Sequence, residues 1–206
     1  MNLIKKINSY DIVVFDFDGI IVDSNEIKRE SIALATERNS SKERALSFTK
    51  YFVSNNGIPR KIKIEKFFNK KISAKILKDY NKILEEKESE IKVNPEFLEI
   101  FPKIKIKKII LSGGEKNEIE RLLDQNRLSN KFDLILSAPK TKNENLKCAN
   151  LTGKILFIGD SRIDYEVSLN NNLDFIFYAK FTQEEYPYSF LDKSVPSINN
   201  LTLWIK

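Results

Sequence analysis

The chain has 206 residues, of which 41% are hydrophobic and 31% charged, and its net charge is +6. It contains no histidine and one cysteine, Cys148, which excludes Ser-His-Asp and Cys-His catalysis, an internal disulfide and a cysteine-cluster zinc site. No stretch approaches the ~20 apolar residues of a membrane span, and Asn8, Ser9 and Asp11 interrupt the apolar stretch that a signal peptide would need. We therefore expect a cytoplasmic protein that does not bind a membrane.

Short apolar runs that end in small or acidic residues predict five β-strands. Helix-period stretches separate the later runs, and this alternation is typical of a parallel sheet that is covered on both faces. We therefore predict an α/β fold with a doubly wound parallel sheet. The predicted strands are residues 12–17, 108–112, 134–137, 155–159 and 175–178, and the helices between them are 115–125, 142–150 and 162–171.

Residues 25–94 interrupt this alternation, because their pattern predicts three helices, 26–38, 42–53 and 74–91, with a turn at 54–59. The simplest organisation is a core formed by residues 1–24 and 95–206, with a helical domain of residues 25–94 inserted after the first strand. This segment holds 17 lysines and arginines against 10 aspartates and glutamates, so the whole positive excess of the chain lies in it. Such charge suits either a solvated surface or a lid that attracts anions.

Polar and small residues follow each of the first four predicted strands. In open α/β sheets, ligands bind beyond the carboxyl ends of the strands, so we expect these residues to meet at one edge of the sheet. Asp16 and Asp18 follow the first strand, Ser112, Gly113 and Gly114 the second, Lys140 and Lys142 the third, and Asp160 and Asp164 the fourth.

Three aspartates at one edge, Asp16, Asp18 and Asp160, would repel one another unless a cation lay between them. Because the chain offers no histidine and a single cysteine, an oxygen-liganded ion is expected, and we predict Mg²⁺. A magnesium ion beside a serine, a glycine-rich turn and a lysine suits phosphoryl transfer, since the metal neutralises phosphate charge while a carboxylate attacks. Ser112 and the backbone N–H groups of Gly113 and Gly114 are candidates to bind phosphate oxygens.

These residues also carry a resemblance to a known family. The stretches DFDGIIVDS and IILSGG, a lysine after the third strand and IGDSRIDYEVSLNNN resemble the four motifs of the haloacid dehalogenase superfamily, with the helical insert where that family carries its cap. The resemblance implies that Asp16 is the nucleophile and Asp18 the general acid/base, whose backbone carbonyl binds Mg²⁺. It further implies that Ser112 binds phosphate, that Asp160 binds the metal, and that Asp164 supports the metal water or the lysine.

For the lysine of the third motif, Lys142 is preferred to Lys140 because it opens a helix and stands 18 residues before Asp160. The helical cap points to the phosphoglycolate-phosphatase and β-phosphoglucomutase-like branch, and the stretch NNGIPRKIKIEKFF is similar to a group that we associate with surface-sugar biosynthesis. That similarity makes Arg60 and Lys63 candidates to reach the substrate from the cap.

The function that we predict is a Mg²⁺-dependent phosphatase that hydrolyses a small organic phosphate monoester, such as a sugar phosphate, through an aspartyl-phosphate intermediate. Its partner would be a small anionic phosphate substrate and not a nucleic acid, and we expect a monomer or weak dimer. Three alternatives stay open: a phosphomutase of the same family, a receiver-like phospho-acceptor module, and a polyanion-binding module that uses the basic helical insert.

Overall fold

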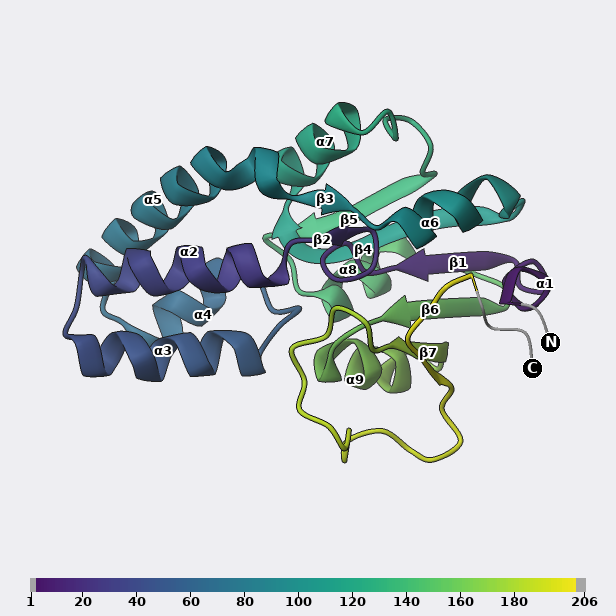
Figure 1. Cartoon of the computed structure of the whole chain (residues 1–206). Helices are drawn as coiled ribbons and strands as arrows, with labels where there is room; N and C mark the ends of the chain where they lie inside the picture. The colour runs from purple at the N-terminus through teal and green to yellow at the C-terminus, as the bar shows by residue number, and fades with distance from the viewer. Residues whose placement is uncertain (1–2, 203–206) are drawn as a thin grey trace.

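At the centre of the molecule is a six-stranded sheet in the order β5-β4-β1-β6-β7-β8, in which neighbouring strands are parallel (Figure 1). The computed structural model describes residues 3–202. The sheet confirms the predicted doubly wound α/β fold, while β8 has only two residues, too few to leave a periodic signal in the sequence. The strands are β1 (Ile12–Phe15), β4 (Lys107–Glu115), β5 (Leu134–Ala138), β6 (Ile155–Gly159), β7 (Asp174–Tyr178) and β8 (Ser197–Ile198).

Alternate side chains of the central strand pack on opposite faces of the sheet. Val13 and Phe15 belong to a buried cluster with α1 (Leu3–Ile7), α6 (Pro95–Ile100) and α7 (Lys116–Gln125), near the short 3₁₀ turn η2 (Phe101–Lys103). Ile12 and Val14 pack on the other face with α8 (Lys142–Ala149) and α9 (Arg162–Asn170). Both faces of the sheet are therefore covered, and the carboxyl ends of the strands form the edge at which polar groups can gather.

Four helices lie together beyond the carboxyl ends of β1 and β6 (Figure 1). They are α2 (Asn25–Glu37), α3 (Lys42–Ser54), α4 (Arg60–Phe67) and α5 (Lys70–Lys87), and we call them the four-helix layer. Phe48, Phe52, Phe68 and Tyr80 are buried in its interior. The antiparallel pair β2 (Val22–Asp23) and β3 (Lys92–Val93) joins the layer to the sheet, because it brings the chain leaving the sheet beside the chain returning to it.

The four-helix layer differs from the sequence-based prediction in two places. Helix α4 is missing from the prediction, because its lysine-rich sequence RKIKIEKF has little apolar periodicity. Helix α5 begins at Lys70 and not at residue 74, because the side chain of Asn69 accepts a hydrogen bond from the Ile72 backbone N–H at 3.0 Å and so caps the helix. It ends at Lys87, where the 3₁₀ turn η1 (Glu88–Glu90) follows.

Candidate active site

Asp16 lies directly after β1, the strand that has β4 on one side and β6 on the other. Its backbone N–H donates to the Ile158 carbonyl at 3.0 Å, and its side chain is buried. The carboxylate oxygen Oδ1 accepts from the Phe17 backbone N–H at 2.7 Å and lies 2.8 Å from Lys142 Nζ. Burial, reinforced by the charge of Asp164, raises the pKa of Asp16 to about 8.

Asp160 and Asp164 come to the same place from the end of β6 and the first turn of α9. Asp160 Oδ2 accepts from Asn25 Nδ2 at 2.8 Å, whereas its buried Oδ1 has no hydrogen-bond partner within residues 3–202. Burial and the charges of Asp16 and Asp164 raise the pKa of Asp160 well above its usual range. A buried carboxylate oxygen without a donor is costly unless a cation binds it.

One oxygen from each of Asp16, Asp160 and Asp164 lies within 4.8 Å of the other two. This set of buried oxygens fits a divalent metal ion, since carboxylates are the ligands that Mg²⁺ prefers. The side chain of Asp18 stands outside this group of three. Its Oδ1 instead accepts from Ser24 Oγ at 2.5 Å and lies 2.5 Å from Lys28 Nζ.

Gly19 allows the loop after β1 to approach the carboxylate cluster of Asp16, Asp160 and Asp164. Its φ is +80°, a left-handed backbone conformation that favours glycine, and a Cβ placed there would lie 2.0 Å from Asp160 Oδ2. The same Cβ would lie 2.7 Å from Asn25 Nδ2, the donor to Asp160. The glycine after the two aspartates is therefore required for space as well as for backbone conformation.

The structure brings Lys142, and not Lys140, to the carboxylates. Lys142 Nζ is fully buried, 2.5 Å from Asp164 Oδ1 and 2.8 Å from Asp16 Oδ1. Burial would lower the pKa of Lys142, but the charges of Asp16 and Asp164 outweigh it and raise that pKa. Lys140 is exposed, and its Nζ contacts Cys148 Sγ at 3.2 Å. Thr141 caps α8 with its side chain and so places Lys142 as the first residue of that helix.

Ser112 is fully buried on β4, and its Oγ accepts from the Gly114 backbone N–H at 2.9 Å. Strand β4 continues to Glu115 with a shift of register after Leu111, so Gly113 and Gly114 lie in an irregular strand and not in the turn expected from the sequence. Gly114 N–H is thus used within the protein, and the Ser112 oxygen serves as its acceptor. A Cβ on Gly113 would lie 2.5 Å from the Gly57 carbonyl of the four-helix layer.

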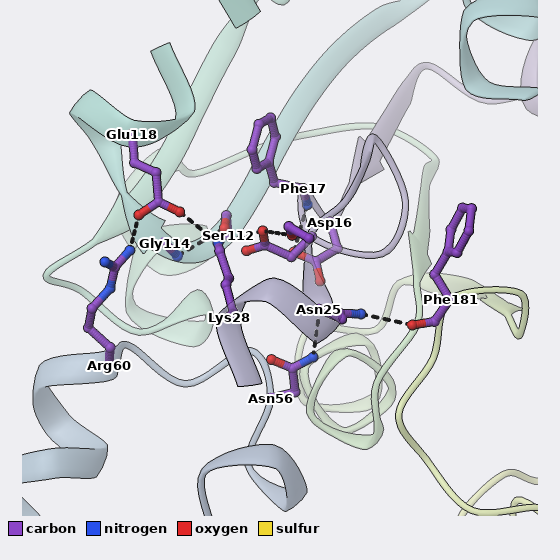
Figure 2. A network of polar contacts seen from close by, with 12 residues as sticks. Asp16, Phe17, Asn25, Lys28, Asn56, Arg60, Ser112, Gly114, Glu118 and Phe181 are labelled. Atoms are coloured by element: carbon purple, nitrogen blue, oxygen red, sulfur yellow. Dashed lines mark hydrogen bonds and ion pairs between the residues drawn. The ribbon is translucent and has the colours of Figure 1, made fainter. Parts of the chain in front are cut away.

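Arg60 differs from the solvated side chain that is usual for an arginine. It is 6% exposed, forms an ion pair with Glu118, and its guanidinium lies 4.8 Å from the centre of the Tyr80 ring. Glu118, from α7, also lies 2.7 Å from Lys28 Nζ, so one carboxylate serves two cations (Figure 2). Burial alone would raise the pKa of Glu118, but the charges of Lys28 and Arg60 outweigh it and hold that pKa at about 2.

A small cavity of about 30 Å³ lies between the carboxylates after β1 and the four-helix layer. Its lining includes two acids, Asp16 and Asp18, and three cations, Lys28, Arg60 and Lys63. Gly113 and Gly114 also border it. Six of the sequence-predicted residues thus border one cavity, and Asp16 connects it to the buried cluster with Asp160, Asp164 and Lys142.

Three residues of the site are missing from the sequence-based set. Asn25 and Lys28 belong to the first turn of α2, one helical turn apart, and reach Asp160 and Asp18. They are three residues apart, which places them on the same side of a helix, and this helix follows Asp18 closely. That position is the one feature of the sequence that could have indicated them. Glu118 gives no such signal, because an acidic residue in the first turn of a helix is common for electrostatic reasons alone.

A family model described as haloacid dehalogenase-like hydrolase matches residues 13–178. The chain belongs to this family. No curated protein matches the sequence at a significant level. Within the described part of this hydrolase, residues 3–202, no helix is both long and apolar enough to cross a membrane.

Solved structures with the same fold resemble this hydrolase along most of its length. A predicted phosphatase from Clostridium acetobutylicum has a TM-score of 0.70 at 21% identity, covering 86% of this chain and 88% of that one. A hydrolase from Pseudomonas syringae has a TM-score of 0.70 at 16% identity, covering 94% and 95%. A predicted phosphoglycolate phosphatase from Haemophilus somnus has a TM-score of 0.64 at 13% identity, covering 82% and 85%. At these identities the likeness concerns the fold.

Proposed function

We propose that this hydrolase is a Mg²⁺-dependent phosphatase that cleaves small organic phosphate monoesters, such as a sugar phosphate, through an aspartyl-phosphate intermediate. The supporting observation is a buried Asp16 beside Lys142, in a carboxylate cluster where Asp160 Oδ1 has no hydrogen-bond partner among the residues that the structure describes. In this proposal the four-helix layer, within residues 25–94, is a cap over a core of residues 1–24 and 95–206. The names of the structural neighbours that are described as phosphatases agree with this reaction.

The Mg²⁺ ion would be held by carboxylate oxygens of Asp16 and Asp160 and by the backbone carbonyl of Asp18. Asp164 would support this arrangement from behind, because it already accepts from Lys142 and from Ser161 Oγ at 2.7 Å. When bound, the ion neutralises charge on the phosphate so that an anionic nucleophile can approach it. The orphan oxygen of Asp160 and the all-oxygen donor set are the features of this chain that fit the ion.

Asp16 and Asp18 would divide the bond-making and proton-transfer roles. One carboxylate oxygen of Asp16 attacks phosphorus, and the bond between phosphorus and the ester oxygen breaks. Asp18 gives its proton to that oxygen, so that the product leaves as an alcohol. In the second half, Asp18 takes a proton from water, the water oxygen attacks phosphorus, and the bond to Asp16 breaks. Inorganic phosphate then leaves, and both aspartates return to their starting states.

Lys142 and Ser112 would stabilise charge during both halves. The Lys142 ammonium lies 2.8 Å from Asp16 Oδ1, where it orients the nucleophile and offsets the charge that gathers on the phosphate oxygens. The Ser112 hydroxyl, whose oxygen already accepts from Gly114 N–H, has its hydrogen available for a phosphate oxygen.

The test is a turnover screen over phosphate monoesters, including p-nitrophenyl phosphate, with Mg²⁺ and with EDTA. We expect phosphate release with Mg²⁺, its loss in EDTA, and its loss in Asp16→Asn. The matched control is Asp124→Asn, which changes an exposed aspartate of α7 and should keep wild-type turnover. Full activity in EDTA, or wild-type activity of Asp16→Asn, would refute the mechanism. Transfer of phosphate to a second position of the same sugar would instead favour a phosphomutase.

A further inference from the structure

Asn25 is a buried amide that joins three segments lying far apart in the sequence. It is the first residue of α2 and is 4% exposed. Its Nδ2 donates to Asp160 Oδ2 at 2.8 Å and to the Phe181 carbonyl at 2.9 Å. Its Oδ1 accepts from Asn56 Nδ2 at 3.2 Å, and Figure 2 shows the bonds to Phe181 and Asn56. An amide group has two hydrogens and both are used here, so Asn25 is suited to position other groups and not to bind a substrate.

The bond to Asp160 fixes how that carboxylate is presented to the proposed metal site. Asn25 holds Oδ2, while Oδ1 is buried and has no hydrogen-bond partner within residues 3–202. The carboxylate cannot rotate without breaking the bond to Asn25, so Oδ1 stays in one position. Hydrogen-bond partners of this kind orient metal ligands, and their loss typically lowers metal affinity by roughly 10- to 100-fold.

The bond to Asn56 attaches the turn between α3 and α4 to the same amide. This turn, residues 55–59, packs closely on the core, since a Cβ on Gly113 would lie 2.5 Å from the Gly57 carbonyl oxygen. Asn56 and Gly57 also line the cavity. The hydrogen bond between Asn56 and Asn25 therefore depends on the turn being docked against the core.

We propose that Asn25 is a positioning residue that couples the docking of this turn to Asp160, so that Mg²⁺ and the docked turn stabilise each other. The inference rests on the proposed Mg²⁺ site. Asn56 holds the Asn25 amide in the orientation that donates to Asp160, because turning the amide over would place its oxygen against the carboxylate oxygen. Coupling of two equilibria is reciprocal, so what the docked turn adds to metal affinity, the metal adds to docking.

The experiment measures Mg²⁺ affinity by isothermal titration calorimetry in wild type, Asn25→Ala, Asn56→Ala and the double variant. We expect Asn25→Ala to weaken Mg²⁺ binding roughly tenfold or more, and Asn56→Ala to weaken it about fivefold, although its hydrogen bond goes to an amide and not to a carboxylate. The double variant should bind as weakly as Asn25→Ala alone, because the second change acts only through Asn25. The matched control is Asn55→Ala in the same turn, whose side chain donates to the Tyr51 carbonyl at 2.8 Å, and it should keep wild-type affinity.

Hydrogen exchange of the backbone amides of residues 55–58 gives a second readout, which a purely structural role of Asn25 would not produce. Mg²⁺ should slow exchange in this turn in wild type and in Asn55→Ala, but not in Asn25→Ala. If Asn25 only supported the fold, its loss would speed exchange by the same factor with and without the ion. The comparison of wild type with and without Mg²⁺ remains decisive even if Asn25→Ala does not fold.

Three results would overturn the coupling: exchange in the wild-type turn that Mg²⁺ leaves unchanged, wild-type Mg²⁺ affinity in either single variant, or losses that multiply in the double variant. Hydrolysis of p-nitrophenyl phosphate without the coupling would refute the role of Asn25 alone. Coupling in a protein that hydrolyses no phosphate ester would refute the phosphatase function alone. A wild type that binds no Mg²⁺ would refute both.

Discussion

Replacing Asp16 by asparagine should abolish turnover and yet make the metal-free protein more stable. Asp16 is buried within 4.8 Å of oxygens from Asp160 and Asp164, so its charge is desolvated and repelled when no ion is bound. Asparagine has nearly the same shape, and its side-chain oxygen can still accept from the Phe17 backbone N–H. The substitution therefore removes an unfavourable charge while it keeps the local hydrogen bond.

The magnitude follows from the pKa of Asp16, which burial and the charge of Asp164 raise from 3.8 to about 8. At about 1.4 kcal/mol per pKa unit, this shift corresponds to roughly 6 kcal/mol of lost stability once the pH exceeds both values. The pKa of about 8 already includes the attraction of Lys142, and the gain is reduced because the asparagine amide must itself be buried, which costs roughly 2–7 kcal/mol where its hydrogen bonds are incomplete. We expect a net stabilisation of about 2 kcal/mol, or roughly 4–8 °C in Tm for a chain of this size.

The Tm difference between Asp16→Asn and wild type should depend on pH. Because the folded-state pKa of Asp16 is raised, its contribution to stability is complete below about pH 4 and is lost as the pH rises towards 8. The Tm advantage of Asp16→Asn should therefore be small at pH 4, grow up to pH 8, and then level off. Differential scanning calorimetry in EDTA across this range measures it, with Asp124→Asn as the control that should stay within about 1 °C of wild type.

Addition of Mg²⁺ provides a further check. The ion should raise the Tm of wild type more than that of Asp16→Asn, because the variant lacks one negatively charged ligand. The reasoning is refuted if, in EDTA at pH 8, the variant melts below wild type, or if its Tm difference does not change with pH. Either result would mean that Lys142 compensates Asp16 fully without a metal ion.

Two further changes test other parts of the site. Glu118→Gln should cost about 3–5 kcal/mol at pH 7, because it leaves Lys28 and Arg60 buried without their shared acid. Since these cations hold the pKa of Glu118 at about 2 against the effect of burial, the stabilisation is present above about pH 4.5 and lost as the pH falls towards 2. Thermal melts followed by circular dichroism should show the stabilities of wild type and Glu118→Gln converging at acidic pH. A stability difference that does not change with pH would contradict the role given to Glu118 as the shared partner of Lys28 and Arg60. Gly19→Ala should raise the Mg²⁺ concentration for half-maximal activity at least tenfold, because the new methyl group would lie 2.0 Å from Asp160 Oδ2. An unchanged Mg²⁺ titration would show that Asp160 is not a ligand.

The sequence alone predicted a parallel sheet, five of its strands and the residues gathered at its edge. Apolar runs that alternate with helical periods require parallel strands, and the carboxyl ends of parallel strands share one edge. For this reason Asp16, Ser112 and Asp160 could be expected together before their distances were known. The preference for Lys142 over Lys140 rested instead on the resemblance to the third family motif, because Lys142 opens a helix and stands 18 residues before Asp160.

Only the tertiary structure decided how the four-helix layer meets that edge. The ion pair between Arg60 and Glu118 joins residues 58 positions apart, and nothing local to either residue indicates the other. Lys28 is an ordinary helical lysine in sequence, but the packing of α2 brings it to Asp18 and Glu118. The burial of Lys63 likewise depends on where α3 places Phe52. Local periodicity encodes which face of an element is buried, whereas the partner of a buried charge depends on the packing of elements that are distant in sequence.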